Sequence, residues 1–192
     1  MVGVFFHQPH EQRAILLILG MSAFITEYPQ FFTASIKGRH KILEEDKYKD
    51  IIIDSLRFLV EDKRIVLYSF VIMPDHLHLI WQMQPLIHPQ HLQRDFLKYT
   101  AQKIKFDLQK INPELLETFR SDANDRTYQF WKRRALSIEL RTDKVHQQKL
   151  EYIHENPVKA AMCKLPEEYK YSSALFYHTG IESWGFLTHH RD

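Results

Sequence analysis

The spacing of apolar and polar positions changes several times along the chain, and each change predicts a new element. Segments rich in aromatic and β-branched residues predict strands, whereas apolar residues at every third or fourth position predict helices. The predicted strands are 30–36, 64–73, 76–83 and 133–141. The predicted helices are 41–62, 92–110 and 142–154, with Thr142 as the N-cap of the last one. Neither pattern is present in the polar segment 112–127, which predicts a loop, or in the irregular, aromatic-rich segment 166–180.

In chain order these elements are β-α-β-β-α-β, followed by one more helix. That order is typical of the ferredoxin-like, split β-α-β fold. It is an α+β arrangement in which a four-stranded antiparallel sheet carries helices on one face, here with an additional C-terminal helix. Because many unrelated functions share this fold, the function has to be argued from individual residues.

The N-terminal region contains the longest uncharged apolar run, AILLILGMSAFI at 14–25. Its twelve residues are too few to cross a bilayer, which takes about 20 residues in a helix. The alternatives are an extra helix or translated sequence upstream of the true start, and the second is favoured because MSAFITEYPQFF resembles a natural beginning. We therefore expect an N-terminal extension at 1–26, one domain at 27–178 and a C-terminal tail at 179–192.

Composition narrows the class of protein without identifying its function. A hydrophobic content of 44% and a charged content of 26% are ordinary for a globular chain of 192 residues. The formal net charge is only +2, so any surface that binds nucleic acid has to be local. A single cysteine, Cys163, excludes an intramolecular disulfide and a four-cysteine zinc site, and it favours a cytoplasmic protein that does not enter a membrane.

Two histidines interrupt the apolar strand at 76–83. Side chains alternate across a strand, so His76 and His78 point the same way, about 6.6–6.8 Å apart along the chain. Leu77, Leu79 and Trp81 point the other way, toward the expected helices, which leaves the histidines on the open face of the sheet. Two neutral imidazoles on a rigid strand can bind one divalent cation when a third ligand approaches. The alternative is a pair of hydrogen-bonded histidines without a metal.

A candidate third ligand and a candidate nucleophile lie near the end of the last helix. Tyr152 and Asn156 stand four residues apart and share one helix face, with Cβ atoms about 6 Å apart. Asn156 precedes Pro157, which disfavours helical geometry, so Asn156 is predicted to end the helix and to reach outward. Taken alone, Tyr152 could equally be a packing aromatic, and its functional interpretation depends on the combination with the histidine pair.

The combination resembles a known family. MPDHLHLIWQ together with YIHENPVKAAMCKLPEEYKYSSA is similar to the insertion-sequence-200-like single-tyrosine transposases, and most similar to their REP-associated branch. The resemblance covers about Tyr28 to Tyr177. It departs from the family at Ala161, where glycine is common, and at Tyr171, where tryptophan is common. The loop 111–127 is also longer than the family's usual connection, a difference that concerns the substrate more than the chemistry.

The family belongs to the HUH endonucleases, and the resemblance assigns roles to four residues. His76 and His78 match the metal-binding pair, Asn156 matches a third metal ligand, and Tyr152 matches the catalytic nucleophile. The implied reaction is cleavage and rejoining of single-stranded DNA at hairpins through a 5′-phosphotyrosine. The implied metal is Mg²⁺ or Mn²⁺, although a histidine pair would also hold Zn²⁺ or Ni²⁺. Relatives act as monomers or as homodimers.

DNA binding is expected from local clusters of basic residues. Basic side chains contact phosphates and aromatic rings stack on bases in single-stranded DNA. The alternative for a basic helix is an ordinary solvated face. The predicted DNA-binding residues are Arg94, Lys98, Lys103, Lys105, Trp131, Lys132, Arg133, Arg134 and Lys159.

Two other functions fit parts of the sequence. The same fold could be a domesticated protein that binds DNA hairpins with little or no cleavage. A zinc hydrolase would need a further histidine, cysteine or carboxylate ligand, which no compact motif supplies. Formation of a covalent adduct with a hairpin oligonucleotide separates the transposase from the binding protein.

Overall fold

The computed structural model describes residues 28–191, so the expected N-terminal extension at 1–26 lies outside the described residues. Its sheet has four antiparallel strands in the order β2-β3-β1-β4. The strands are β1 (Gln30–Ser35), β2 (Ile65–Met73), β3 (His76–Met83) and β4 (Leu136–Glu139). The α-helices are α2 (Asp46–Glu61), α3 (Pro89–Ile111), α4 (Pro113–Glu117), α5 (Asp143–Lys159) and α6 (Ala174–Thr179). Short 3₁₀ turns span Lys37–Arg39, Ile42–Glu44 and Pro166–Glu168.

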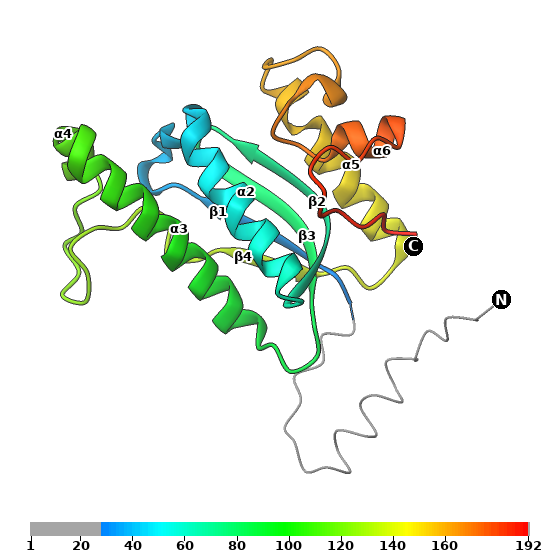
Figure 1. Ribbon diagram of the computed structural model, residues 1–192, viewed down its shortest axis with the longest axis horizontal. Coiled ribbons are helices and arrows are strands. Elements are labelled where there is room, and N and C mark those ends of the chain that lie inside the picture. The colour runs from blue at the N-terminus through cyan, green and yellow to red at the C-terminus, as the bar shows by residue number, and fades with distance from the viewer. Residues whose placement is uncertain (1–27, 192) are drawn as a thin grey trace, which may run out of the picture.

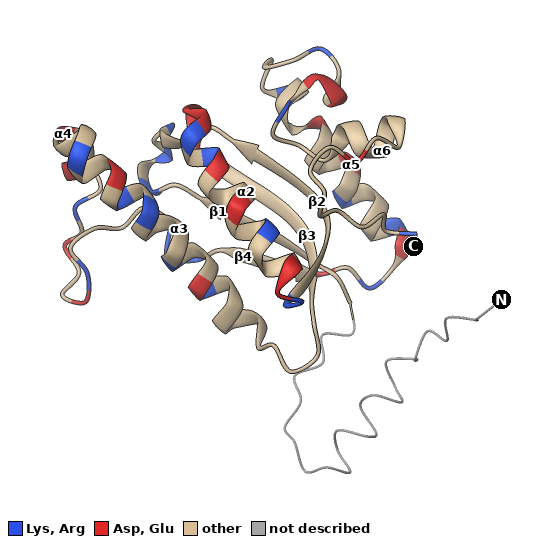
Figure 2. Ribbon diagram, in the orientation of Figure 1, with Lys and Arg blue, Asp and Glu red and all other residues tan. Residues whose placement is uncertain are grey.

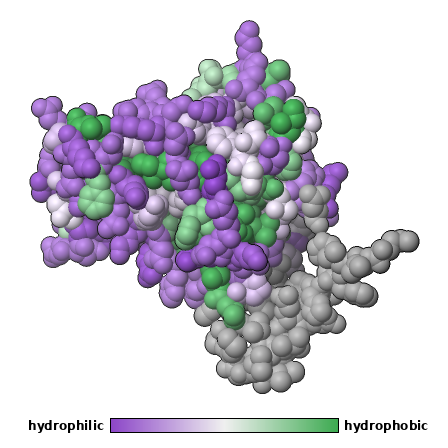
Figure 3. Space-filling model, in the orientation of Figure 1, coloured by the Kyte–Doolittle hydropathy of each residue, from purple (hydrophilic) through white to green (hydrophobic). Residues whose placement is uncertain are grey.

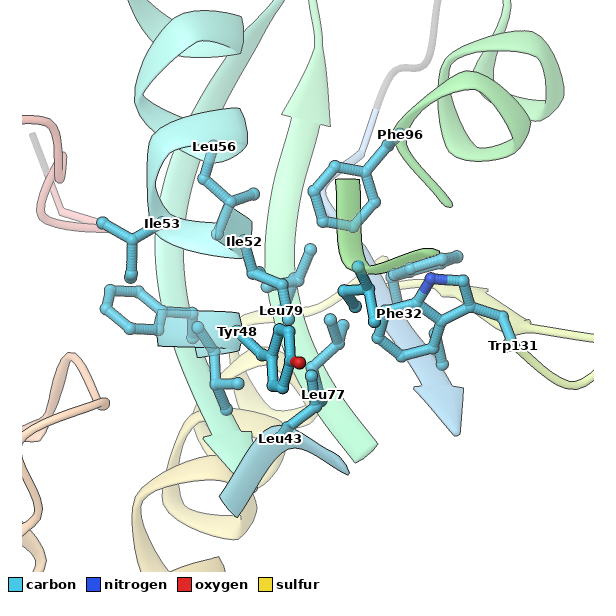
Figure 4. Close-up of a cluster of buried hydrophobic side chains, with 14 of the residues drawn as sticks. Phe32, Leu43, Tyr48, Ile52, Ile53, Leu56, Leu77, Leu79, Phe96 and Trp131 are labelled. Carbon is cyan, nitrogen blue, oxygen red and sulfur yellow. The ribbon is translucent and has the colours of Figure 1, made fainter. Parts of the chain in front are cut away.

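The predicted α+β, ferredoxin-like fold is confirmed, with α2 and α3 packed on one face of the sheet (Figure 1). Alternate residues of β1 and β3 face this layer and form the main hydrophobic core with the two helices. Full burial of each large apolar side chain contributes about 1.5–3 kcal/mol, so this core dominates the stability of the sheet. Figure 4 labels Phe32, Leu43, Tyr48, Ile52, Ile53, Leu56, Leu77, Leu79, Phe96 and Trp131.

The opposite face of the sheet is covered in part by α5. Phe31, Val71 and Ile80 from the strands pack with Leu150 and Ile153 of α5 in a second, smaller core. The face expected to be open is therefore partly closed, because a helix with its own apolar stripe has to bury that stripe against the sheet.

Several element boundaries differ from the predicted ones. α2 begins only at Asp46, because residues 42–44 form a 3₁₀ turn. α3 begins at Pro89, whose fixed φ suits the first helical position. The predicted loop 112–127 contains the short helix α4, for which Asn112 provides the N-cap by accepting a bond from the Leu115 N–H.

β4 is much shorter than the predicted strand 133–141. It lies at the edge of the sheet and pairs only with residues 30–33 of β1. Edge strands are often short because only one of their sides is hydrogen-bonded within the sheet.

Helix α5 continues to Lys159, so the prediction that Asn156 ends it is wrong. Thr142 is its N-cap as predicted, accepting a bond from the Val145 N–H. Pro157 lies in the last turn, where its missing N–H removes one helical hydrogen bond without stopping the helix. The side chain of Asn156 therefore projects from regular helical backbone and not from the end of the helix.

The C-terminal segment packs against the rest of the fold. Residues 166–180, predicted as irregular, contain α6, and Phe186 beyond it is buried in the main core. The Thr188 N–H donates to the Leu67 carbonyl over 3.0 Å, which ties the segment assigned as a tail to β2.

The outer surface of the helical layer is mostly hydrophilic, with separate hydrophobic patches (Figure 3). None of the helices within residues 28–191 is both long and apolar enough to cross a membrane.

Candidate active site

The two histidines of β3 lie side by side, with ring centroids 4.9 Å apart. Each ring is held through its Nδ1 atom. Thr33 Oγ1 lies 2.7 Å from His78 Nδ1, and Asp75 Oδ1 lies 2.6 Å from His76 Nδ1. Asp75 is itself paired with Arg39 over 2.7 Å. An Nδ1–H bond to an oxygen partner leaves the lone pair on Nε2, which is the arrangement seen around metal-binding histidines.

His78 is the more buried of the two rings, and only 4% of it is exposed. Burial lowers its pKa to about 3, with further contributions from His76, Lys149 and Arg39. The ring is therefore neutral near pH 7, as a metal ligand has to be. Its Nε2 atom is buried and has no hydrogen-bond partner among the described residues. A buried polar atom without a partner costs about 1–3 kcal/mol, which a bound cation would offset.

Helix α5 places Tyr152 directly against the histidine pair. The phenol ring lies edge-on to His78, with centroids 5.1 Å apart, and 5.9 Å from the ring of Phe31. Tyr152 is 42% exposed, so a substrate can reach it. The structure thus brings together residues that are 74 positions apart in the sequence, 152 against 78.

Asn156 lies one helical turn after Tyr152 on the same face of α5 and is half-buried. Within residues 28–191, no group of three or more His, Cys, Asp or Glu side chains is arranged to hold a metal ion. A third protein ligand would have to be of another type, and the amide of Asn156 fits that requirement. Its role as a ligand stays a prediction.

Lys149 is a site residue that the sequence reasoning missed. Its Nζ atom lies 4.8 Å from the centroid of Phe31 and 5.6 Å from that of Tyr152. Its position three residues before Tyr152, and hence on the same helix face, is the signal that could have found it. Its ammonium group brings positive charge to a site at which a phosphate would react.

A buried polar cluster fixes α5 on the sheet. His154 Nε2 lies 3.0 Å from Ser173 Oγ, which also contacts Ser69 Oγ over 2.8 Å. Ser173 Oγ accepts a further bond from the Phe70 N–H over 3.1 Å. The residue after Phe70, Val71, pairs with His78 across the sheet. The cluster therefore sets the position of Tyr152 relative to the histidines.

A basic groove of about 920 Å³ lies between α3 and residues 125–135. Figure 2 colours the Lys and Arg positions of α3 blue. Asp125 also lines the groove but is paired with Arg126. The segment before β4 is tied to the sheet, because the Lys132 N–H donates to the Ser35 carbonyl and Ser35 pairs with His76. Two strand spacings, about 10 Å, therefore separate the backbone of Lys132 from that of His76. Seven predicted DNA-binding residues line this groove, namely Arg94, Lys98, Lys105, Trp131, Lys132, Arg133 and Arg134.

Three predicted DNA-binding residues differ from the others in position or burial. Trp131 lines the groove, but it is only 6% exposed and its Nε1–H donates to Thr100 Oγ1 over 3.1 Å, so most of its ring packs in the core. Its role in base stacking stays a prediction. Lys103 lies outside the groove, with Nζ 5.5 Å from the ring of Tyr99. Lys159 lies in the last turn of α5, on the face that carries Asn156.

Comparisons with known proteins bear on the family and the fold of the chain. A family model described as "Transposase IS200 like" matches residues 30–156. The structure of a REP-associated tyrosine transposase bound to a REP hairpin is similar, with 17% identity and a TM-score of 0.60, over 86% of this chain and 88% of that one. A crystal structure of a Deinococcus radiodurans protein assigned as a transposase has 20% identity and a TM-score of 0.39, over 66% and 88% of the two chains. No curated protein matches the sequence.

At this level of identity the solved structures show the fold alone. The family model, in contrast, covers well over half of the sequence and includes both histidines, Tyr152 and Asn156. The chain therefore belongs to the family of IS200-like transposases.

Proposed function

We propose that this transposase cleaves and rejoins single-stranded DNA at hairpins through a covalent bond between Tyr152 and a 5′-phosphate. One observation carries the proposal. The phenol of Tyr152 lies against His78, whose buried Nε2 atom has no partner among the described residues. A nucleophile beside a pair of neutral imidazoles is the arrangement that metal-assisted phosphoryl transfer needs.

The residues present fit a divalent cation, which we propose is Mg²⁺ or Mn²⁺. The Nε2 atoms of His76 and His78 would hold it, with the amide oxygen of Asn156 as third ligand. When bound, such a cation neutralises charge that develops on the scissile phosphate.

The chain's own residues account for the remaining steps. The Tyr152 oxygen attacks phosphorus and loses its proton, the bond from phosphorus to the 3′ oxygen breaks, and that oxygen takes up a proton. The energy of the broken ester is kept in the phosphotyrosine, so the reverse attack by a 3′-hydroxyl rejoins DNA without ATP. The Lys149 ammonium group, 5.6 Å from the phenol ring centroid, lies where it can neutralise negative charge on the reacting groups.

We propose a DNA hairpin with an adjoining unpaired segment as the substrate. The similar REP-associated transposase is bound to a REP hairpin, and the backbone of Lys132, which lines the basic groove of this chain, lies about 10 Å from that of His76. Basic side chains along such a groove suit the phosphates of an unpaired strand.

Labelled hairpin oligonucleotides incubated with Mn²⁺ test the proposal, with a protein-bound label on a denaturing gel as the measurement. Tyr152→Phe is expected to abolish the labelled adduct while keeping hairpin affinity within about twofold, because only the nucleophilic oxygen is removed. Tyr99→Phe, at an exposed tyrosine of α3, is the matched control and should keep the adduct. Tight, metal-independent binding without an adduct on any hairpin would instead favour the domesticated binding protein.

A further inference from the structure

The strand register places two residues of β4 on the face that carries the active site. Directly opposed residues of an antiparallel pair project to the same face of the sheet. Thr33 pairs with His78 on one side and with Leu136 on the other, and Phe31 pairs with Ile138. Leu136 is therefore two strands from His78, a distance of about 10 Å.

These two β4 residues are apolar and uncovered. Leu136 is 52% exposed and Ile138 is 39% exposed, although both lie beside the buried ring of Phe31. Helix α5, which closes the rest of this face, packs mainly over β2 and β3 and leaves the edge strand open. We call the pair Leu136 and Ile138 the β4 shelf.

Positive charge lies close to the β4 shelf. Lys149 Nζ lies 4.8 Å from the ring of Phe31, the residue that pairs with Ile138. Lys132, Arg133 and Arg134 precede Leu136 by two to four residues and line the basic groove. An apolar surface next to cations matches a nucleotide, whose base has an apolar face and whose phosphate is anionic.

We propose that the β4 shelf supports the base of a nucleotide adjacent to the scissile phosphate, with its phosphate directed toward Lys149. The shelf would thereby hold the unpaired strand in register with Tyr152. This inference rests on the proposed function, because it takes the scissile phosphate to lie at Tyr152 and the histidines. It adds a subsite that positions the DNA without contacting the reacting atoms.

A double-mutant cycle between protein and DNA tests the β4 shelf. Abasic sites are placed one at a time in the unpaired segment of the tightest-binding hairpin, and affinity is measured with full-length Tyr152→Phe protein, which cannot form the adduct. One abasic position is expected to weaken binding about tenfold, because its base no longer stacks on the shelf. In protein that also carries Leu136→Ser and Ile138→Ser, the same abasic site should weaken hairpin binding less than twofold.

The matched control carries Leu165→Ser and Ile181→Ser, two aliphatic residues that are 51% and 61% exposed elsewhere on the chain. It should keep the tenfold sensitivity. Equal sensitivity in the shelf variant and the control, or no sensitive position at all, would overturn the inference. So would sedimentation that shows a dimer lost only in the shelf variant, since a second copy would then be the occupant.

The outcomes separate this inference from the proposed function. An adduct with wild-type protein, without coupling to the β4 shelf, would support cleavage and contradict the subsite. Coupling in the binding cycle, without an adduct from wild-type protein, would contradict cleavage and support the subsite.

Discussion

Thr33 determines which nitrogen of His78 is available to a ligand. Its hydroxyl oxygen lies 2.7 Å from Nδ1 across 45 residues of sequence. The histidines and Tyr152 could be predicted because their roles follow from short motifs. Thr33 could not, because its role depends on which residue of β1 is paired with His78.

Replacing Thr33 by valine keeps the shape of the side chain and removes the oxygen. With no acceptor for Nδ1–H, His78 loses its fixed tautomer and orientation, and Mn²⁺ affinity is expected to fall about 10- to 100-fold. Calorimetric titration of the full chain with Mn²⁺ measures this. Thr33→Ser retains the hydroxyl and should stay within a fewfold of wild type. Equal Mn²⁺ affinity in all three proteins would contradict the role given to Thr33.

The backbone conformation of Ala161 gives a physical reason why glycine is common at this position in the family. It follows the last turn of α5 with a φ of 54°, and its N–H donates to the Val158 carbonyl over 2.9 Å. The Met162 N–H donates to the Pro157 carbonyl over 2.9 Å, which completes a Schellman motif. Left-handed backbone disfavours any residue with a Cβ atom, so glycine is the better residue at this position.

Ala161→Gly is expected to raise the free energy of unfolding by about 0.5–1 kcal/mol, since relief of left-handed strain exceeds the added chain entropy. Urea denaturation measures the change. Ala160→Gly is the neighbouring control, because Ala160 has a φ of −86° and gains nothing from glycine. The free energy of unfolding of that variant should fall by about 0.5–1 kcal/mol. A change of the same sign for both substitutions would contradict the backbone strain assigned to Ala161.

At the scale of elements, α5 and β4 show where sequence patterns succeed and fail. The apolar stripe of α5 predicted a helix, but no local pattern indicated that it would close the histidine face of the sheet. Its end was misplaced because Pro157 was expected to stop a helix that tolerates proline in its last turn. The predicted strand 133–141 was longer than β4 because residue types that favour strands do not show where pairing ends at the edge of a sheet.

Ser173→Ala tests how α5 is held. The substitution removes the partner of the Phe70 N–H and of His154 Nε2, both buried, and is expected to cost about 1–3 kcal/mol of unfolding free energy. Tyr152 would lose its fixed position, so adduct formation should slow more than hairpin affinity falls. Ser172→Ala is the control, since within residues 28–191 its Oγ accepts a bond from the Ala174 N–H alone. Equal effects at both serines would argue against the cluster as the anchor of α5.

For the molecule as a whole, the layer arrangement could be predicted from the order of elements, but the distribution of charge over its surface could not. Basic residues from α3 and from the segment before β4 converge on one groove, although up to 40 positions, 94 to 134, separate them. The basic sequence context around Trp131 did not reveal that most of its ring packs in the core.

Arg133→Ala combined with Arg134→Ala is expected to weaken hairpin binding and to reduce the slope of log affinity against log salt by about 2. Each guanidinium that contacts a phosphate releases about one counterion on binding. Affinity measured from about 50 to 200 mM salt gives the slope. Lys63→Ala with Arg57→Ala, at two cations that do not line the groove, should leave the slope unchanged. An unchanged slope in the arginine variant would exclude the groove as the DNA path.

The packing of α5 on its own sheet has one further consequence. A single polypeptide supplies four groups of the candidate site, namely His76, His78, Lys149 and Tyr152. We therefore expect the rate of adduct formation per molecule to stay constant as the protein is diluted.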